Sequence, residues 1–395
     1  MTAAYKKYCF LLLACCASTL LPILALNLIL IEKSLNSPEN IKLASRWQQE
    51  THGIVSAPSM LDNVRFKQLR LQDRINDIDT VIFGASTTFA VEQDMFPASL
   101  HIYNFSKNGV GLNTMIGEAE YLLGHTETVK WLFIPLDWSI GFIYHDALPP
   151  TLDLSAQYPG VQRREIGLLE KLRDACSYPR IAGLFQLIKD IVRSEHEFGA
   201  FRQIFLQPGS DEYSCPDGMR AKDFDSQNPG VCRGFRSDGS WTFNGMDRVS
   251  DAHKLAMLAV SSSSQYTTSL SKAKGIPNPD YLQRLADLAH QAERRGGGAV
   301  FFAPPLLPGM ELEFLRHPEW SAYLAHTKKT LSAWSTTKNL VFFDAGQSEK
   351  FGCTADEFTD EHHATSPCYR KVFSAFWQNA NKPDGTPLLQ PKKPH

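Results

Sequence analysis

The sequence lacks a surplus of basic residues. Its 395 residues include 40 Lys and Arg against 42 Asp and Glu, which gives a formal net charge of −2 at pH 7. The basic residues are scattered along the chain, apart from the short Lys392–Lys393 pair near its end. A protein that binds nucleic acid needs an excess of cationic side chains to neutralise phosphates. We therefore expect no nucleic acid among its partners.

The sequence also lacks the cysteine spacing that is typical of a structural metal site. None of the eight cysteines forms a Cys-x-x-Cys pair, which is the spacing typical of zinc sites. No internal repeat is evident, and the length suits one large domain with insertions, or two domains. We expect neither a metal ion nor an organic cofactor.

A long uncharged run is present near the N-terminus. Residues 9–31 are mostly apolar, and the run ends only at Glu32 and Lys33. This length is enough for a helix to cross a bilayer, whereas a cleavable signal peptide has a shorter apolar core. The sequence therefore predicts an uncleaved transmembrane anchor. Residues 12–15 (Leu-Leu-Ala-Cys) resemble a lipoprotein box, so lipidation at Cys15 is the alternative.

Two lysines set the expected orientation of this anchor. Lys6 and Lys7 precede the apolar run, and positive residues tend to stay on the cytoplasmic side. Residues 1–8 are therefore expected in the cytoplasm. The helix would cross the inner (cytoplasmic) membrane once, and the rest of the chain would be extracytoplasmic, on the periplasmic side.

The cysteines outside the anchor agree with an oxidising compartment. They are Cys176, Cys215, Cys232, Cys353 and Cys368. Cys215 with Cys232, and Cys353 with Cys368, are close enough to close short loops, each worth about 3 kcal/mol in the chain-entropy model. These four are the possible disulfide cysteines, although sequence alone does not fix their connectivity.

Short β-branched and aromatic runs recur along the chain and alternate with helical patterns. The runs occupy residues 80–83, 101–105, 129–136, 299–303 and 340–343, and the helical patterns lie around 114–123, 280–295 and 369–379. Continuous apolar strands separated by helices indicate a parallel sheet that is covered on both faces. The sequence therefore predicts an α/β fold.

These patterns divide the chain into seven predicted segments. They are a cytoplasmic N-terminus (1–8), the anchor (9–31), a juxtamembrane stalk with some helix (32–78), the first part of the core (79–144), an insertion or cap (145–278), the second part of the core (279–381) and a disordered tail (382–395). The insertion is helical in pattern around residues 164–196. It is either a surface decoration or a wall of a substrate groove, because loops at the carboxyl ends of parallel strands carry function.

A serine follows the first predicted strand. Gly84 and Ala85 precede Ser86, and such small residues let a substrate approach the backbone closely. The alternative is that Ser86 only caps the next helix. Thr88 stands where the second glycine of Gly-x-Ser-x-Gly would be, which argues against an α/β-hydrolase elbow.

A carboxylate and an imidazole lie close together near the C-terminus. Asp360 precedes His363 by three residues, so its carboxylate can reach Nδ1 and leave Nε2 free for the hydroxyl of Ser86. The three side chains would form a Ser-His-Asp hydrolytic site. His362 is the competing base, and the Asp-Glu-His-His run could instead be a solvated turn or a set of metal ligands.

Together these segments resemble the sequence blocks of the SGNH/GDSL hydrolase superfamily. Gly84-Ala85-Ser86 resembles the first block, with Ala85 where the family often has Asp. Residues 104–109 (Asn-Phe-Ser-Lys-Asn-Gly) resemble the glycine block, and residues 360–371 closely follow the terminal Asp-x-x-His block. The resemblance implies a flavodoxin-like, three-layer α/β/α sandwich with a parallel sheet, to which this chain adds a transmembrane helix and a large insertion.

The resemblance also implies a role for each site residue. Ser86 would be the nucleophile, His363 its base and Asp360 the group that orients the base. The backbone N–H groups of Ser86 and Gly109 would form the oxyanion hole, with Gly111 as the alternative to Gly109.

The third block departs from the family pattern. Asp137 stands where the family usually has an asparagine, which donates a hydrogen bond to the oxyanion. An ionised carboxylate cannot donate. Losing one such donor typically costs about 10²–10³ in rate.

Membrane-anchored, externally facing members of this family often modify polysaccharides of the cell envelope. By resemblance we expect a serine acyltransferase or esterase that acts on O-acetyl groups of such a polysaccharide through an acyl-serine. An integral membrane acyltransferase would be its partner. The alternative is a binding or assembly protein that keeps the fold without efficient chemistry, which Ala85 and Asp137 favour.

Overall fold

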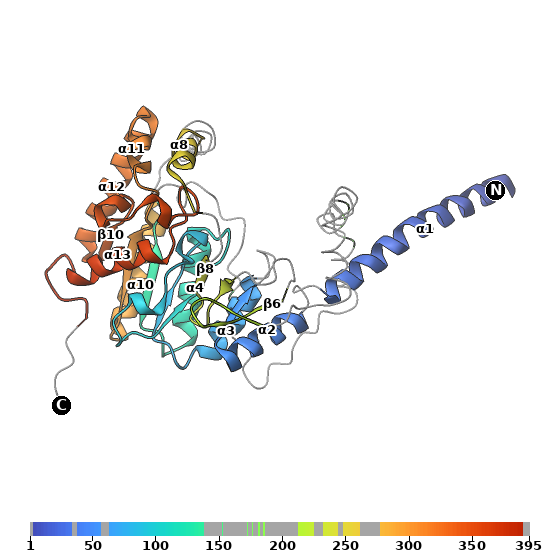
Figure 1. Ribbon diagram of the computed structural model, residues 1–395, viewed down its shortest axis with the longest axis horizontal. Helices are drawn as coiled ribbons and strands as arrows, with labels where there is room; N and C mark the ends of the chain where they lie inside the picture. The colour runs from blue at the N-terminus through green and yellow to red at the C-terminus, as the bar shows by residue number, and fades with distance from the viewer. Residues whose placement is uncertain are drawn as a thin grey trace.

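One long helix extends away from the rest of the chain in the computed structural model (Figure 1). The structure describes residues 3–33, 38–56, 63–137, 212–224, 232–243, 248–260 and 277–389, with five single residues between 152 and 185. Helix α1 (Ala3–Lys33) is long and apolar enough over Lys7–Leu28 to cross a membrane. Its apolar side chains, such as Phe10 and Leu20, are exposed rather than packed in a core. The predicted N-terminal apolar helix is therefore present.

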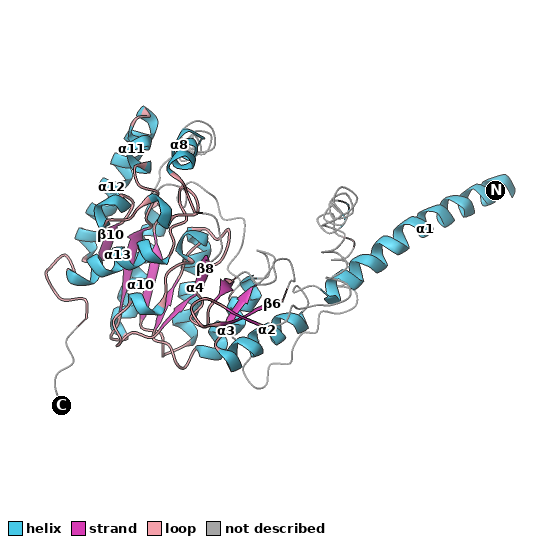
Figure 2. Ribbon diagram, in the orientation of Figure 1, coloured by secondary structure: helices cyan, strands magenta, loops and turns pink. Residues whose placement is uncertain are grey.

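A five-stranded parallel sheet lies at the centre of the fold (Figure 2). Its strands are β2 (Thr80–Ile82), β3 (Ile102–Asn104), β4 (Trp131–Pro135), β9 (Gly298–Ala303) and β10 (Val341–Asp344). They are arranged in the order β10-β9-β4-β2-β3. Each strand coincides with one of the predicted runs to within two residues, and the predicted α/β class is confirmed.

Helices cover both faces of this sheet. They are α4 (Leu112–His125), α10 (Pro279–Arg294), α11 (Met310–Leu315), α12 (Pro318–Lys338) and α13 (Ser366–Gln378), and α8 (Asp251–Val260) lies in the chain before α10. Phe301 of β9 packs on Trp334 of α12, and the next residue, Phe302, packs on Phe373 of α13. Because successive side chains of a strand point to opposite faces, α12 and α13 lie on opposite sides of the sheet.

The predicted stalk is folded against the core from Pro38 onward. It forms α2 (Pro38–Thr51), β1 (Ile54–Ser56) and α3 (Asn63–Arg74). Ile41 and Phe66 are 1 % exposed and belong to the main hydrophobic core. The apolar residues of this polar, mixed segment therefore contribute to the fold rather than to a free spacer.

Strand β1 also organises a second, mixed sheet with the order β5-β6-β1-β7-β8. The other strands come from the predicted insertion: β5 (Tyr213–Ser214), β6 (Arg220–Asp223), β7 (Arg233–Phe235) and β8 (Trp241–Phe243). A disulfide joins Cys215 to Cys232 within this unit. The helical pattern predicted around residues 164–196 lies mostly outside the described residues.

A buried lysine connects this small sheet to the core. Lys67 donates hydrogen bonds from Nζ to the carbonyl oxygens of Asn104, at 2.5 Å, and Gly239. The ring of Phe235 lies 4.7 Å from the same nitrogen. Burial lowers the pKa of Lys67 well below its usual value. The β7–β8 hairpin is thereby fixed to the end of edge strand β3.

Residues 382–389 of the predicted disordered tail are folded onto the core. Asn381 forms an isolated bridge with Pro387, Leu388 is 6 % exposed, and Lys382 pairs with Glu293 of α10. Residues 390–395 of the predicted disordered tail lie outside the described residues.

Candidate active site

Three side chains from two distant segments form one hydrogen-bonded chain. Ser86 Oγ lies 2.8 Å from His363 Nε2, and His363 Nδ1 lies 2.5 Å from Asp360 Oδ2. The backbone N–H groups of His362 and His363 donate to the other carboxylate oxygen, Asp360 Oδ1, at 3.0 and 2.8 Å. This is the connectivity that a hydroxyl, a base and an orienting carboxylate require.

Ser86 stands at the carboxyl end of β2, as the first residue of the short helix η1 (Ser86–Thr88). The strand order reverses between β2 and β4, so two connections leave the sheet in opposite directions there. Ligands of open α/β sheets bind in the crevice at such a switch point. The topology therefore predicts a binding crevice at the position of Ser86, which is half-buried.

The turn that presents Ser86 is held by buried polar contacts. Thr88 Oγ1 lies 3.0 Å from the carbonyl oxygen of Ala85 and 2.7 Å from Ser106 Oγ. A Cβ on Gly84 would collide with the Thr88 side chain, so only glycine fits there. From α13, Tyr369 Oη donates to the Thr87 carbonyl oxygen at 2.6 Å.

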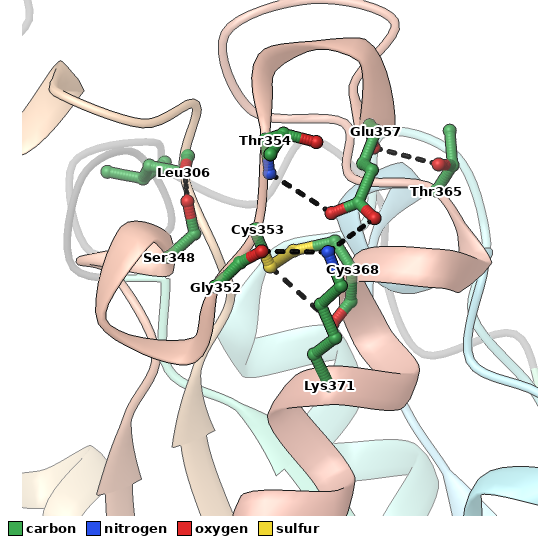
Figure 3. The surroundings of a disulfide bond; sticks show 9 residues. All are labelled: Leu306, Ser348, Gly352, Cys353, Thr354, Glu357, Thr365, Cys368 and Lys371. Carbon is green, nitrogen blue, oxygen red and sulfur yellow. Dashed lines mark hydrogen bonds and ion pairs between the residues drawn. A yellow bond between two sulfur atoms is a disulfide. The ribbon is translucent and has the colours of Figure 1, made fainter.

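Asp360 and His363 share a loop that is closed by a disulfide. Cys353 and Cys368 form this bond, and both residues are buried (Figure 3). Within the loop, the N–H and the hydroxyl of Thr365 both donate to the carbonyl oxygen of Glu357, each at 2.8 Å. Both predicted disulfide pairs are thus formed, and this one encloses two of the three site residues.

Electrostatics favour an ionised carboxylate in this chain. Burial alone would raise the pKa of Asp360, but the hydrogen bond and charge of His363, with the nearby His362, outweigh it and hold that pKa well below its usual value. Asp360 therefore remains an acceptor at neutral pH. In that state it fixes the proton of the His363 ring on Nδ1 and leaves Nε2 free to accept from Ser86.

His362, the competing base, faces carboxylates instead of the serine. Its Nδ1 lies 3.4 Å from Glu361 Oε1 and 3.8 Å from Asp360 Oδ1. Burial lowers its pKa, yet Glu361, Asp360 and Asp137 together raise it above the usual value. His362 therefore carries its own proton more readily than an exposed histidine, which suits a structural cation better than a base.

Asp137, at the end of β4, lies near the site without contributing a donor. Its negative charge adds to burial in raising the pKa of the Tyr369 phenol, and it also raises that of His362. A carboxylate therefore stands after β4 beside the candidate active site.

The glycine block lies next to the serine turn. Lys107 donates its backbone N–H to the carbonyl oxygen of Gly84 at 2.9 Å, and its side chain forms a buried ion pair with Glu118 of α4. Gly109 follows in the left-handed region, at φ 65°, which favours glycine. Gly111 precedes α4 as its N-cap residue. Within the described part of the chain, no hydrogen bond occupies the N–H of Ser86 or of Gly109.

Asp360, His362 and His363 could also offer three metal-ligand atoms within 4.8 Å of one another. Both ring nitrogens of His363 are engaged, however, one with Asp360 and the other with Ser86. A second possible set includes Cys353 and Cys368, whose sulfur atoms are joined to each other. In neither set are all three donor atoms free of a hydrogen bond or a disulfide.

Sequence reasoning missed the contacts that support the site. Thr88 pairs with Ser106, and Lys107 with Glu118, across gaps that no local pattern reveals. Comparisons of the chain with protein-family models, with curated proteins and with solved structures found no match.

Proposed function

We propose that this protein is a membrane-anchored, extracytoplasmic serine acyltransferase or esterase. The observation that carries the proposal is the continuous hydrogen-bonded chain from Ser86 through His363 to Asp360. A serine hydroxyl is a weak nucleophile unless an adjacent base removes its proton. Here the base lies at hydrogen-bond distance and is itself oriented by an ionised carboxylate.

The first half of the reaction forms an acyl-serine. His363 Nε2 takes the proton from Ser86 Oγ as that oxygen attacks the carbonyl carbon of the acyl donor. Asp360 stabilises the imidazolium that results. The tetrahedral oxyanion is stabilised by the N–H groups of Ser86 and Gly109. Collapse of this intermediate expels the alcohol of the donor, which takes the proton back from His363.

The second half transfers the acyl group. Water makes the protein an esterase, whereas a sugar hydroxyl makes it an acyltransferase. In either case His363 deprotonates the incoming oxygen, which attacks the acyl-serine, and Ser86 Oγ leaves with the proton. One site therefore serves both reactions, and the acceptor decides between them.

The fold supports an assignment to the SGNH type. Renumbered along the chain, the strand order of the parallel sheet is 2-1-3-4-5, the order of flavodoxin-like folds. The serine follows strand one, the glycine block follows strand two, and the Asp-x-x-His segment precedes the last helix. We propose that the chain has a flavodoxin-like, SGNH-type core with the small mixed sheet added.

The expected setting follows from the apolar helix and the two disulfides. An anchored domain on the oxidising side of a membrane is positioned to modify envelope polysaccharide. We propose O-acetyl groups as the transferred groups and an integral membrane acyltransferase as the partner that supplies them.

A second function is favoured by one observation. Asp137 replaces the oxyanion donor with a carboxylate, and losing such a donor costs about 10²–10³ in rate. A protein with this change could bind or assemble envelope polysaccharide without efficient chemistry. Measured turnover separates the two functions.

The test follows hydrolysis of 4-nitrophenyl acetate by the detergent-solubilised full chain, with intact mass spectrometry of the protein during turnover. We expect the protein to gain the mass of one acetyl group. Ser86→Ala should abolish both the gain and the hydrolysis, and Ser332→Ala, on the exposed side of α12, should change neither. Hydrolysis that survives in Ser86→Ala would reject the proposal.

A further inference from the structure

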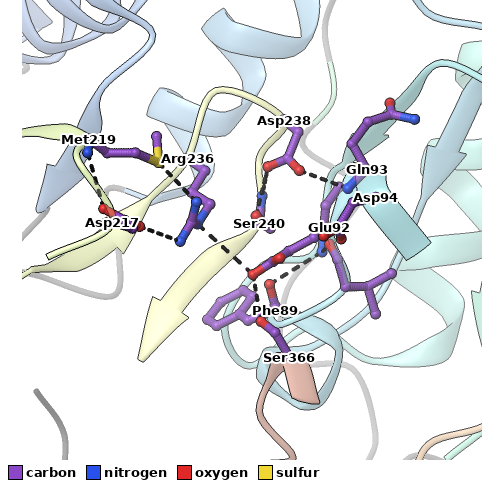
Figure 4. A network of polar contacts seen from close by, with 12 residues as sticks. Phe89, Glu92, Gln93, Asp94, Asp217, Met219, Arg236, Asp238, Ser240 and Ser366 are labelled. Atoms are coloured by element: carbon purple, nitrogen blue, oxygen red, sulfur yellow. Dashed lines mark hydrogen bonds and ion pairs between the residues drawn. The ribbon is translucent and has the colours of Figure 1, made fainter. Parts of the chain in front are cut away.

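A polar cavity of about 510 Å³ lies between the small mixed sheet and the first turn of α13. Figure 4 shows polar contacts among several of its lining residues. Its lining residues come from η2 (Gln93–Met95) and its flank, from the β5–β6 turn, from the hairpin β7–β8, from the segment before α8, and from the start of α13 with the residue before it. They include four carboxylates and three guanidinium groups: Glu92, Asp94, Asp217, Asp238, Arg236, Arg248 and Arg370. Phe243 and Pro367 are the two apolar residues of the lining.

One wall of this cavity is fixed by charged hydrogen bonds. Glu92 accepts from Ser366 Oγ at 2.5 Å and pairs with Arg370. Arg370 in turn lies 2.8 Å from Asp94 Oδ2. Because the segment before η2 and the start of α13 hold each other in this way, the wall is already in place before any ligand binds.

The opposite wall has donors that are not used. Arg236 reaches Asp217 at 3.0 Å, but its buried Nε makes no hydrogen bond with any described residue, and the nearest oxygen of Glu92 is 3.9 Å away. Arg248 is exposed. Its charge acts on the Asp356 carboxyl, but it makes no hydrogen bond or ion pair within the part of the chain that the structure describes. These guanidinium groups can donate to oxygen atoms of a ligand.

The lining selects one chemical class of ligand. An acyl chain would leave the charged walls unsatisfied, and a polyanion would face four carboxylates. A sugar presents hydroxyl groups that both donate and accept, so it can meet carboxylates and guanidinium groups together. The volume lies within the usual range for small-molecule sites.

The cavity shares its segments with the candidate active site. Thr365 and Ser366 follow His363 in the same loop, and Glu92 lies six residues after Ser86. We propose that this cavity is a glycan-binding subsite, built partly by the insertion, that holds an acceptor sugar chain beside Ser86. The inference rests on the proposed function and assigns a role to the β7–β8 hairpin.

The experiment measures binding of two probes to the detergent-solubilised full chain by microscale thermophoresis. The probes are cellohexaose, which is neutral, and a β-1,4-linked hexamer of glucuronic acid. We expect Kd values in the millimolar range or tighter, and Arg248→Ala should weaken binding about tenfold, the loss that one charge-assisted hydrogen bond explains. Binding of cellohexaose, alone or together with the acidic hexamer, assigns Arg248 to hydroxyl groups. Binding of the acidic hexamer alone would overturn the inference, because the four carboxylates of the lining disfavour a polyanion.

Two variants separate this inference from the proposed function. Ser86→Ala should bind the probes as tightly as the unaltered chain, because binding needs no nucleophile. Arg316→Ala, at an exposed arginine that directly follows α11, should leave binding unchanged. Failure of both hexamers to bind at millimolar concentration, or an Arg248→Ala variant that binds normally, would overturn the inference while acetyl-serine formation still stood.

Discussion

At the scale of single residues, two aspartates near Ser86 have opposite consequences. Asp360 is held ionised by His363 and by two backbone N–H groups, and its hydrogen bond to Nδ1 orients the His363 ring toward Ser86. Asp137 is also acidic, but it lies where an oxyanion donor is expected. Its charge therefore disfavours the negative oxygen that forms when Ser86 attacks a carbonyl group.

We predict that Asp137→Asn raises hydrolysis of 4-nitrophenyl acetate. The amide can donate a hydrogen bond that the carboxylate cannot, and one donor is worth about 10²–10³ in rate. Because part of that gain depends on geometry, an increase of about tenfold or more in kcat is the expected result. Asp137→Ala serves as the control that removes the charge without adding a donor. Equal rates in all three proteins would remove the missing donor as an explanation.

We predict a pH-dependent effect of His362 on stability. The pKa of His362 is raised in the folded chain, because Glu361, Asp360 and Asp137 outweigh its burial. A raised pKa contributes stability that is fully present below the unfolded value of about 6.5 and is lost as the pH rises through the folded pKa. His362→Gln should therefore lower the melting temperature more at pH 5.5 than at pH 9.

Thermal melts of both proteins across this pH range measure the effect. His290→Gln, on helix α10, is the control, because His290 forms no ion pair with a carboxylate of the described residues. A loss that is equal at both pH values, or larger at pH 9, would contradict the assigned charge of His362.

At the scale of elements, the two disulfides close loops of similar length, but only one of these loops contains residues of the candidate active site. Sequence separations are 15 residues for Cys353–Cys368 and 17 for Cys215–Cys232, so each loop is worth about 3 kcal/mol in the chain-entropy model. The first loop contains Asp360 and His363, and the second contains no residue of the proposed catalytic site. They therefore form a matched pair for separating stability from positioning.

We predict that Cys353→Ala/Cys368→Ala slows acetylation of Ser86 at least tenfold, because the loop no longer holds His363 in place. Cys215→Ala/Cys232→Ala should lower the melting temperature by a similar amount and leave acetylation near its original rate. The measurements are acetylation kinetics by mass spectrometry and a thermal melt of each variant. Equal slowing in both double variants would assign the first disulfide to general stability alone.

The parallel sheet could be predicted because four of its five strands lie in short, largely apolar runs that end at Gly, Pro or Asp, and the fifth, β3, lies in a run with aromatic and β-branched residues. The small mixed sheet could not. Its strands are two to four residues long, and β6 reads Arg-Ala-Lys-Asp, with no hydrophobic periodicity. Its central strand β1 comes from a segment that looks like a polar stalk and pairs with residues far along the chain.

The candidate site was predictable to the extent that it is local. The Asp360–His363 spacing lets the two side chains meet within one loop. The position of Ser86 after β2 follows from the end of an apolar run. Its supporting contacts, such as Tyr369 to Thr87, depend on tertiary packing and have no signal in either segment. The cavity beside the site arises in the same way from distant segments.

At the scale of the whole molecule, helix α1 is exposed, and it is long and apolar enough to anchor the chain in a membrane. We predict that the full chain stays with membranes after an alkaline carbonate wash, and that a variant beginning at Pro38 is soluble. The soluble variant should keep its acetylation rate, because Ile41, Ala44 and Trp47 of α2 pack in the core whereas α1 extends away (Figure 1). Membrane retention of the shortened chain would contradict α1 as the anchor.

Labelling of Cys176 can determine on which side of the membrane the folded domain lies, because Cys176 is exposed and outside both disulfides. A membrane-impermeant maleimide added to intact spheroplasts should label Cys176 if the folded domain is extracytoplasmic, and Cys176→Ser should remove that label. Labelling only after lysis would place the domain in the cytoplasm instead.

The central claim is that Ser86 is a nucleophile activated by His363. Its most direct test is to label the full chain with a fluorophosphonate and to map the adduct by peptide mass spectrometry, in the unaltered protein and in His363→Ala. The account predicts an adduct on Ser86 that is lost in His363→Ala, although that variant remains folded. An adduct that persists without His363, or a folded protein that takes up no label at Ser86, would contradict it.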